Sequence, residues 1–124
     1  MLMPLHRVII FVGDVQKCAE FYGNAFGFKT VPSDLPIAEW AELDTGGCRL
    51  AFHQAHGPNG PIKSSTGSQM NPHKIVFHAQ DVDAARADLV SKGANMGQIK
   101  RFGPLVMCDG QDPEGHVFQI SNRP

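Results

Sequence analysis

Cationic, imidazole and aromatic side chains recur at alternating positions in segments that read as β-strands. Alternate residues of a strand face the same side of a sheet, so this spacing gathers them on common faces. The candidate ligand-binding residues that it selects are Arg7, Phe11, Arg49, His53, Lys74, His78 and Gln119. Arginine offers a planar fork of donors and lysine a point charge, which predicts a small polar or anionic organic ligand. The two histidines of this set are candidates for a general base.

Other interpretations of the same side chains remain open. Long cationic side chains can extend to the rim of a sheet and meet water or neighbouring carboxylates, here Glu39, Glu42 and Asp44. The two histidines can equally be solvated residues without a chemical role. Trp40 joins the ligand-binding candidates because an indole ring can stack on a planar ligand, although packing in the core would also explain it.

The sequence contains no recognisable nucleophile–base pair, phosphate-binding glycine loop or pair of catalytic carboxylates. Its three cysteines, Cys18, Cys48 and Cys108, are widely spaced and form no Cys-x-x-Cys motif. This usage indicates reduced thiols in a cytoplasmic protein rather than a disulfide or zinc framework.

Composition restricts the class of partner. The 124 residues suffice for one domain, and the hydrophobic content of 42% is that of an ordinary globular protein. A formal net charge of −1 gives no electrostatic basis for binding nucleic acid. No apolar run approaches the roughly 18 residues that span a bilayer, and the first residues lack the pattern of a signal peptide. We therefore expect neither nucleic acid nor a membrane as partner.

An internal repeat organises the chain. His6-Arg7-Val8-Ile9 and His73-Lys74-Ile75-Val76 share a histidine, a cation and two branched aliphatic residues, at an offset of 67 residues. Asp14-Val15 and Asp81-Val82 follow eight residues after each histidine. So many agreements at one offset predict two copies of one structural unit.

Each copy predicts a helix followed by strands. Asp14 and Asp81 are typical N-cap residues, and Gly27 and Gly93 stand where a helix favours a left-handed residue after its end. Turn signals separate strands that we expect near 28–32, 37–44 and 47–54, and near 94–100, 103–109 and 115–121.

Residues 55–71 lie between the copies and are rich in glycine, proline and serine. We expect a linker there, and a candidate lid over a site. The prediction is a single domain over 1–124, with one βαβββ module at 4–54 and another at 72–122.

Four segments resemble the vicinal oxygen chelate (VOC) superfamily of glyoxalase I, extradiol dioxygenases, fosfomycin-resistance enzymes and bleomycin-resistance proteins. They are Val12-Gly13-Asp14-Val15, Phe21-Tyr22 with Phe26-Gly27-Phe28, Asp81-Val82-Asp83-Ala84-Ala85, and Asp112-Pro113-Glu114-Gly115-His116. The resemblance spans nearly the whole chain and implies an α+β fold, in which two tandem βαβββ modules form a curled mixed sheet around a cavity with helices on the convex side. It also implies a homodimer. One fold serves many chemistries in this superfamily, so the resemblance leaves the reaction open.

The resemblance also implies where the superfamily holds its metal. The first ligand lies seven residues before the Asp that starts each helix, at Arg7 and Lys74, and the last lies after the Asp-Pro-x-Gly turn, at Gln119. The remaining position aligns best with Arg49, with Ala51 as the alternative. Cations repel a divalent ion and a neutral amide is a poor substitute for a carboxylate, so we expect no metal cofactor.

His6 and His73 offer an alternative, because they hold equivalent positions in the two copies and could ligate Zn, Ni, Mn or Fe. A shift of one residue turns a side chain to the other face of the sheet, where its neighbours are apolar residues suited to packing under a helix. A local bulge would restore the ligand interpretation.

Three functions therefore remain, and enzymatic activity is undecided. The leading hypothesis is a VOC-family, glyoxalase/bleomycin-resistance-like protein that sequesters or transforms a small polar or anionic ligand without metal. The alternative is a metal-dependent glyoxalase-type lyase, isomerase or dioxygenase that uses His6, His73 and an unidentified carboxylate. A third is a protein whose cavity is vestigial and which associates with another protein.

Overall fold

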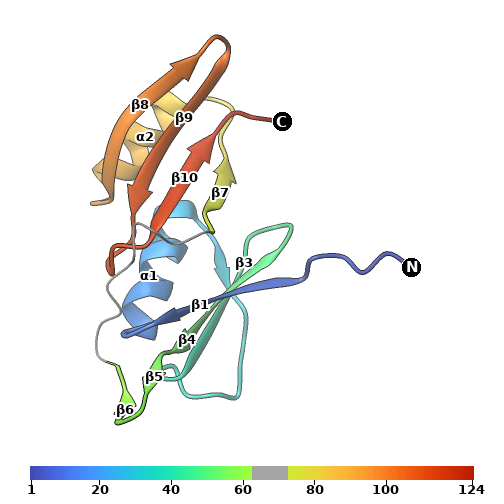
Figure 1. Cartoon of the computed structure of the whole chain (residues 1–124), viewed down its shortest axis with the longest axis vertical. Coiled ribbons are helices and arrows are strands. Elements are labelled where there is room, and N and C mark those ends of the chain that lie inside the picture. The colour runs from blue at the N-terminus through green and yellow to red at the C-terminus, as the bar shows by residue number, and fades with distance from the viewer. Residues whose placement is uncertain (63–72) are drawn as a thin grey trace. The chain divides into compact units, whose positions relative to one another are not determined.

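The computed structural model describes residues 1–62 and 73–124, which form two compact units. The units are Met1–Ser65 and Thr66–Pro124, called here the first and the second module. Each module combines one helix with a four-stranded mixed sheet, as Figure 1 shows. The predicted α+β fold of tandem βαβββ modules is thereby confirmed, and neither sheet is closed.

The first module consists of β1 (Arg7–Val12), α1 (Val15–Phe26), β2 (Lys29–Thr30), β3 (Trp40–Asp44) and β4 (Arg49–Gln54). Its strand order is β1-β4-β3-β2. The first and last strands pair in parallel, and the other neighbours are antiparallel. Two strands that are far apart in the sequence, β1 and β4, therefore lie side by side.

The second module repeats this arrangement with β7 (Ile75–His78), α2 (Val82–Ser91), β8 (Asn95–Phe102), β9 (Leu105–Gln111) and β10 (Val117–Ser121). Its strand order, β7-β10-β9-β8, has the same parallel pair of first and last strands. Each strand of the first four-stranded sheet thus has a counterpart in the second: β1 with β7, β2 with β8, β3 with β9 and β4 with β10.

Both helices begin and end where local capping rules predict. The Asp14 and Asp81 carboxylates each accept a hydrogen bond of 3.0 Å from the backbone N–H three residues later. Gly27 and Gly93 follow the helices with φ of 75° and 90°, in the left-handed region that glycine enters without steric cost. Neither helix is long and apolar enough to cross a membrane, within the part of the chain that the structure describes.

The predicted linker 55–71 is partly structured. Its first residues form a hairpin of β5 (His56–Gly57) and β6 (Gly60–Pro61). The Gln54 side-chain amide closes the hairpin base by donating to the carbonyl oxygens of Ala55 and Ile62, at 3.0 and 2.8 Å. Glycine and proline are typical of tight turns as well as of linkers, so composition alone did not separate the two. The rest of the predicted linker and lid, 63–71, lies outside the described residues.

Each helix covers one face of its own sheet. In the first module Tyr22 of α1 stacks on Phe52 of β4, with ring centroids 5.3 Å apart and both side chains buried. In the second module Phe118 of β10 is fully buried on the helix side. The face turned away from the helix, called here the open face, keeps apolar residues exposed: Phe11 is 58% exposed and Val76 53%. Successive strand residues therefore alternate between the helix-covered face and the open face, as the selection of the candidate residues assumed.

Candidate functional site

Five of the predicted ligand-binding residues share the open face of the first module. They are Arg7 and Phe11 on β1, Trp40 on β3, and Arg49 and His53 on β4. The strand register places Phe11 and Trp40 on either side of His53. The ring centroid of His53 lies 5.6 Å from that of Phe11 and 6.0 Å from that of Trp40. We call these three rings the aromatic group.

The imidazole of His53 has a defined orientation. Its Nδ1 lies 2.8 Å from the carbonyl oxygen of Gln54. A carbonyl oxygen can only accept, so Nδ1 carries the proton in the neutral ring and Nε2 keeps the basic lone pair. His56 lies beside it, with ring centroids 6.3 Å apart. His53 is thus held in the tautomer that a general base at Nε2 requires.

A buried carboxylate gathers the two arginines of this face. Glu42 on β3 has a side chain only 7% exposed, and its Oε2 lies 2.8 Å from Arg7 Nε and 3.6 Å from Arg49 Nη1. The Arg7 guanidinium also lies over the Trp40 ring, 5.8 Å from its centroid. The interpretation that the cations meet a neighbouring carboxylate therefore holds for both arginines, although both also stay beside the aromatic group.

The remaining predicted residues, Lys74, His78 and Gln119, belong to the open face of the second module. Lys74 Nζ lies 3.0 Å from Asp109 Oδ2, and Gln119 Nε2 donates to Asp109 Oδ1 at 3.0 Å. Burial raises the pKa of the Asp109 carboxyl, but the hydrogen bonds from Gln119 and Lys74 outweigh it and hold that pKa below its ordinary value. The eight predicted residues therefore form two groups, one in each module.

Asp109 is the site residue that sequence reasoning missed, and Glu42 was named only as one of three carboxylates that the cations could meet. Each lies 35 residues after the cation that it binds, Arg7 or Lys74. The two carboxylates are themselves 67 residues apart, which is the offset of the repeat. Extending the repeat beyond the module openings would have paired these carboxylates with the two cations.

The strand registers also correct one metal position implied by the resemblance. Gln119 pairs with Val76 and Asp109, and in the first module Ala51 pairs with Ile9 and Glu42 in the same way. Ala51, rather than Arg49, is therefore the counterpart of Gln119. Its side chain is fully buried and carries no ligand atom.

The alternative ligands His6 and His73 both lie just before the first strand of their module, and both are exposed. Within residues 1–62 and 73–124, no three His, Cys, Asp or Glu side chains are grouped closely enough to hold a metal ion.

His116 and Asp112 form a close pair outside both groups. His116 Nδ1 lies 3.0 Å from Asp112 Oδ2, and Asp112 Oδ1 accepts from the backbone N–H groups of Glu114 and His116. The hydrogen bond that His116 donates to the Asp112 carboxylate raises the pKa of the His116 imidazole despite its partial burial. The hydrogen bonds to Asp112 thus stabilise the turn that the Asp-Pro-x-Gly-His motif forms before β10.

The Cys108 thiol is buried in β9. Burial raises the pKa of the Cys108 thiol, which disfavours the nucleophilic thiolate. All three cysteines lie in the described parts of the chain and are free thiols.

Comparison with known proteins adds a family and a set of related folds. Residues 7–121 match the family model of the glyoxalase-like domain. No curated protein matches the chain.

Three solved structures share the fold over nearly their whole length. TnmS3, an antibiotic binding protein from Streptomyces sp. CB03234, is 19% identical with a TM-score of 0.73, over 96% of this chain and 94% of that one. A lactoylglutathione lyase from Agrobacterium tumefaciens is 18% identical with a TM-score of 0.70, over 97% and 93%. A glyoxalase/bleomycin resistance protein/dioxygenase family enzyme from Burkholderia phytofirmans PsJN is 20% identical with a TM-score of 0.69, over 96% and 98%. At these identities the likeness shows the fold alone.

Proposed function

Because this chain belongs to the glyoxalase-like domain family of the VOC superfamily, we propose that it binds a small organic molecule, specifically a planar aromatic compound that carries an acidic group. The observation that carries this proposal is the aromatic group of Phe11, Trp40 and His53 beside the Arg7–Glu42–Arg49 cluster. A structural relative described as an antibiotic binding protein is in line with it.

The aromatic group supports a planar ligand. Phe11 is 58% exposed on a sheet face. Contact of this apolar ring with water is unfavourable, so its exposure favours a ligand that covers it. Aromatic rings stack favourably on flat ligands, and small-molecule sites are commonly apolar surfaces with a few convergent polar groups. Phe11, Trp40 and His53 meet this description within a single sheet.

The charge distribution supports an acidic group on the ligand and favours one of the two arginines as its partner. Arg7 and Arg49 share one carboxylate, so the cluster keeps one excess positive charge. Arg49 makes the longer of the two contacts, with its Nη1 3.6 Å from Glu42 Oε2, and its side chain is 39% exposed. Lys74 and Asp109 form a balanced pair instead. Arg49 is therefore the cation that we assign to the acidic group of the ligand.

We further propose that the protein works without a divalent metal. The donor set at the superfamily's ligand positions does not fit one: Arg7 and Lys74 are cations already paired with Glu42 and Asp109. Ala51 has no donor atom, and Gln119 turns its amide N–H toward Asp109. Divalent ions need deprotonated or lone-pair donors, which Arg7, Lys74 and Ala51 do not present, and the neutral amide oxygen of Gln119 is a poor substitute for a carboxylate.

A second candidate function is metal-independent transformation of the same ligand. The orientation of His53 favours it, because Nδ1 is bonded to the Gln54 carbonyl and Nε2 is left as a base beside the two other rings. A substrate with an acidic C–H or O–H group held on the aromatic group would meet that nitrogen.

The experiment uses the single tryptophan of the chain. The indole N–H of Trp40 gives one cross-peak in a ¹⁵N correlation spectrum, and we expect quinoline-2-carboxylate to shift it saturably. Quinoline, which lacks the acid, should bind about tenfold more weakly because it loses a charge-assisted hydrogen bond. Arg49→Met should remove this difference between the two probes.

The matched control is Arg101→Met, which breaks an exposed ion pair with Asp83 in the second module and should leave both affinities unchanged. The proposal fails if neither probe shifts the Trp40 signal, or if Arg49→Met retains the preference for the acid.

We also propose that the protein is a cytoplasmic homodimer. Exposed apolar side chains on both open faces, including Ile9 and Val76, favour coverage by another sheet, and three free thiols suit a reducing compartment. Size-exclusion chromatography with light scattering should give twice the mass of the chain; the mass of one chain would contradict a dimer.

A further inference from the structure

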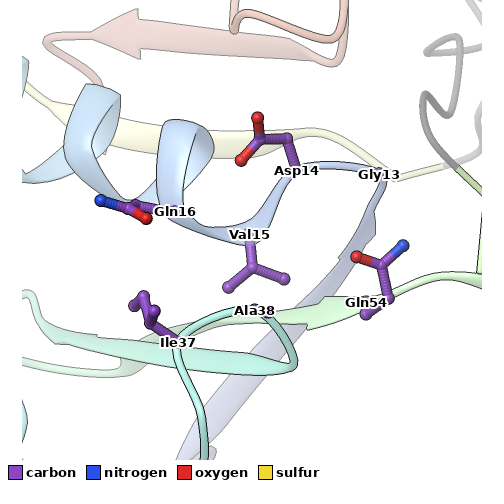
Figure 2. Close-up of a pocket in the computed structure, with 7 residues that line it drawn as sticks. All are labelled: Gly13, Asp14, Val15, Gln16, Ile37, Ala38 and Gln54. Carbon is purple, nitrogen blue, oxygen red and sulfur yellow. The ribbon is translucent and has the colours of Figure 1, made fainter.

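A pocket of about 440 Å³ lies on the helix side of the first module, at the junction of β1 and α1 (Figure 2). It is separate from the aromatic group, because Gln54 shares the sheet face of Phe52, which packs under α1. The lining residues are Gly13, Asp14, Val15, Gln16, Ile37, Ala38 and Gln54. We propose that this pocket is a second binding site, which takes a small neutral amide.

A buried amide side chain supplies the acceptor of the site. Gln54 is only 8% exposed, and its Nε2 donates to the carbonyl oxygens of Ala55 and Ile62. These two bonds fix the orientation of the side-chain amide. The Gln54 carbonyl oxygen accepts no hydrogen bond from the described residues, and Figure 2 shows it on the pocket side of the side chain. A ligand N–H can bond to it.

The start of α1 supplies the donors. The first N–H groups of an α-helix have no carbonyl partner within the helix, and here they belong to the lining residues Val15 and Gln16. The Asp14 carboxylate accepts from the N–H of Lys17, the third residue after it. The pocket therefore presents both donors and an acceptor, which is the pattern that an amide group complements.

The charge of the site selects a neutral ligand. A helix N-terminus ordinarily attracts anions, but the Asp14 carboxylate already occupies this end of α1 and repels a second negative charge. Val15, Ile37 and Ala38 add an apolar wall, on which the body of the ligand can rest (Figure 2). The preference is opposite to that of the open face, where an excess positive charge favours an acid.

The test is a ¹⁵N correlation titration of the full chain with benzamide. We expect saturable shifts of the Val15 and Gln16 backbone signals and of the Gln54 side-chain signals. Methyl benzoate has the same shape without the donor for Gln54 and should bind about fivefold more weakly. Benzoate should bind more weakly still. Equal binding of the three probes, or benzamide shifts that lie elsewhere, would overturn the proposal.

A filled pocket gives the second arm of the test. Ala38 is exposed at the pocket mouth, so Ala38→Trp should block the site without disturbing the core. Ala87→Trp makes the same change at an exposed position of α2 and is the matched control. We expect the first variant to lose the benzamide shifts and the second to keep them. Persistence of binding in Ala38→Trp would place the ligand somewhere else.

Discussion

Glu42 and Asp109 hold equivalent positions in the two modules, and each binds the cation that lies 35 residues before it in the chain. The contacts are 2.8 Å from Arg7 Nε to Glu42 Oε2 and 3.0 Å from Lys74 Nζ to Asp109 Oδ2. The cation of each pair occupies a sheet position where the resemblance implies a metal ligand, and the carboxylate lies on another strand of the same sheet. The repeat thus contains a salt bridge in each copy, and its cation stands where the resemblance implies a metal-binding donor.

Removing the charge of Glu42 should destabilise the first module. Glu42→Gln leaves Arg7 and Arg49 without their shared anion at a side chain that is 7% exposed, so we expect a loss of about 1–3 kcal/mol in the free energy of unfolding. Urea denaturation measures it. Glu39→Gln is the control, since the Glu39 side chain is 47% exposed and its ion-pair contact with His56 Nε2 is longer, at 3.4 Å. A loss no larger than that of the control would contradict the role of Glu42.

Metal content tests the proposed absence of a metal cofactor. Protein purified in the presence of Zn²⁺, Ni²⁺, Mn²⁺ and Fe²⁺ should retain far less than one ion per chain by elemental analysis, and a chelator should leave its melting temperature unchanged. Stoichiometric metal in the wild type would support the metal-dependent alternative instead. In that event His73→Ala, compared with His6→Ala, would show which histidine ligates the ion.

Stability should depend on pH through His116. The Asp112 hydrogen bond raises the pKa of this imidazole in the folded state, so its stabilising contribution is complete below the unfolded pKa and is lost as pH rises through the folded pKa. We expect His116→Asn to cost about 1–2 kcal/mol at a pH near 5.5 and distinctly less at a pH near 8.5. Denaturation at both pH values measures it. The exposed His6→Asn should show no such difference, and an equal cost for His116→Asn at both pH values would exclude the effect.

Gly110 should not tolerate a side chain. A Cβ at this position of β9 would lie 2.7 Å from Cζ of Phe118, a ring that is fully buried, and would also clash with Sδ of Met96. Methionine can shift but the buried ring cannot move freely, so Gly110→Ala should cost about 1–3 kcal/mol. Gly47→Ala is the control, because a Cβ there meets nothing within 4 Å. Thermal unfolding compares the two, and similar melting temperatures would show that the core around Phe118 adapts.

The sequence by itself determined the elements and their faces. Asp14 and Gly27 set the ends of α1 through capping bonds and backbone freedom, which act within a few residues. The alternation along β1 placed Arg7 and Phe11 on one face for the same reason, since successive strand residues point to opposite sides. Capping and strand alternation can therefore be predicted from the sequence alone. The 67-residue offset of the repeat extends the same predictions to the second module.

Only the tertiary structure decided what those faces hold. The partners of Arg7 and Lys74 lie on strands 35 residues away, and the choice of Ala51 over Arg49 depends on the register between β1 and β4. The pocket between Gln54 and the start of α1 likewise requires elements from three parts of the chain. Residue types and spacing predicted which side chains share a face. The charge balance of each face and the second pocket depend on strand register and packing, which arise from contacts between segments distant in sequence.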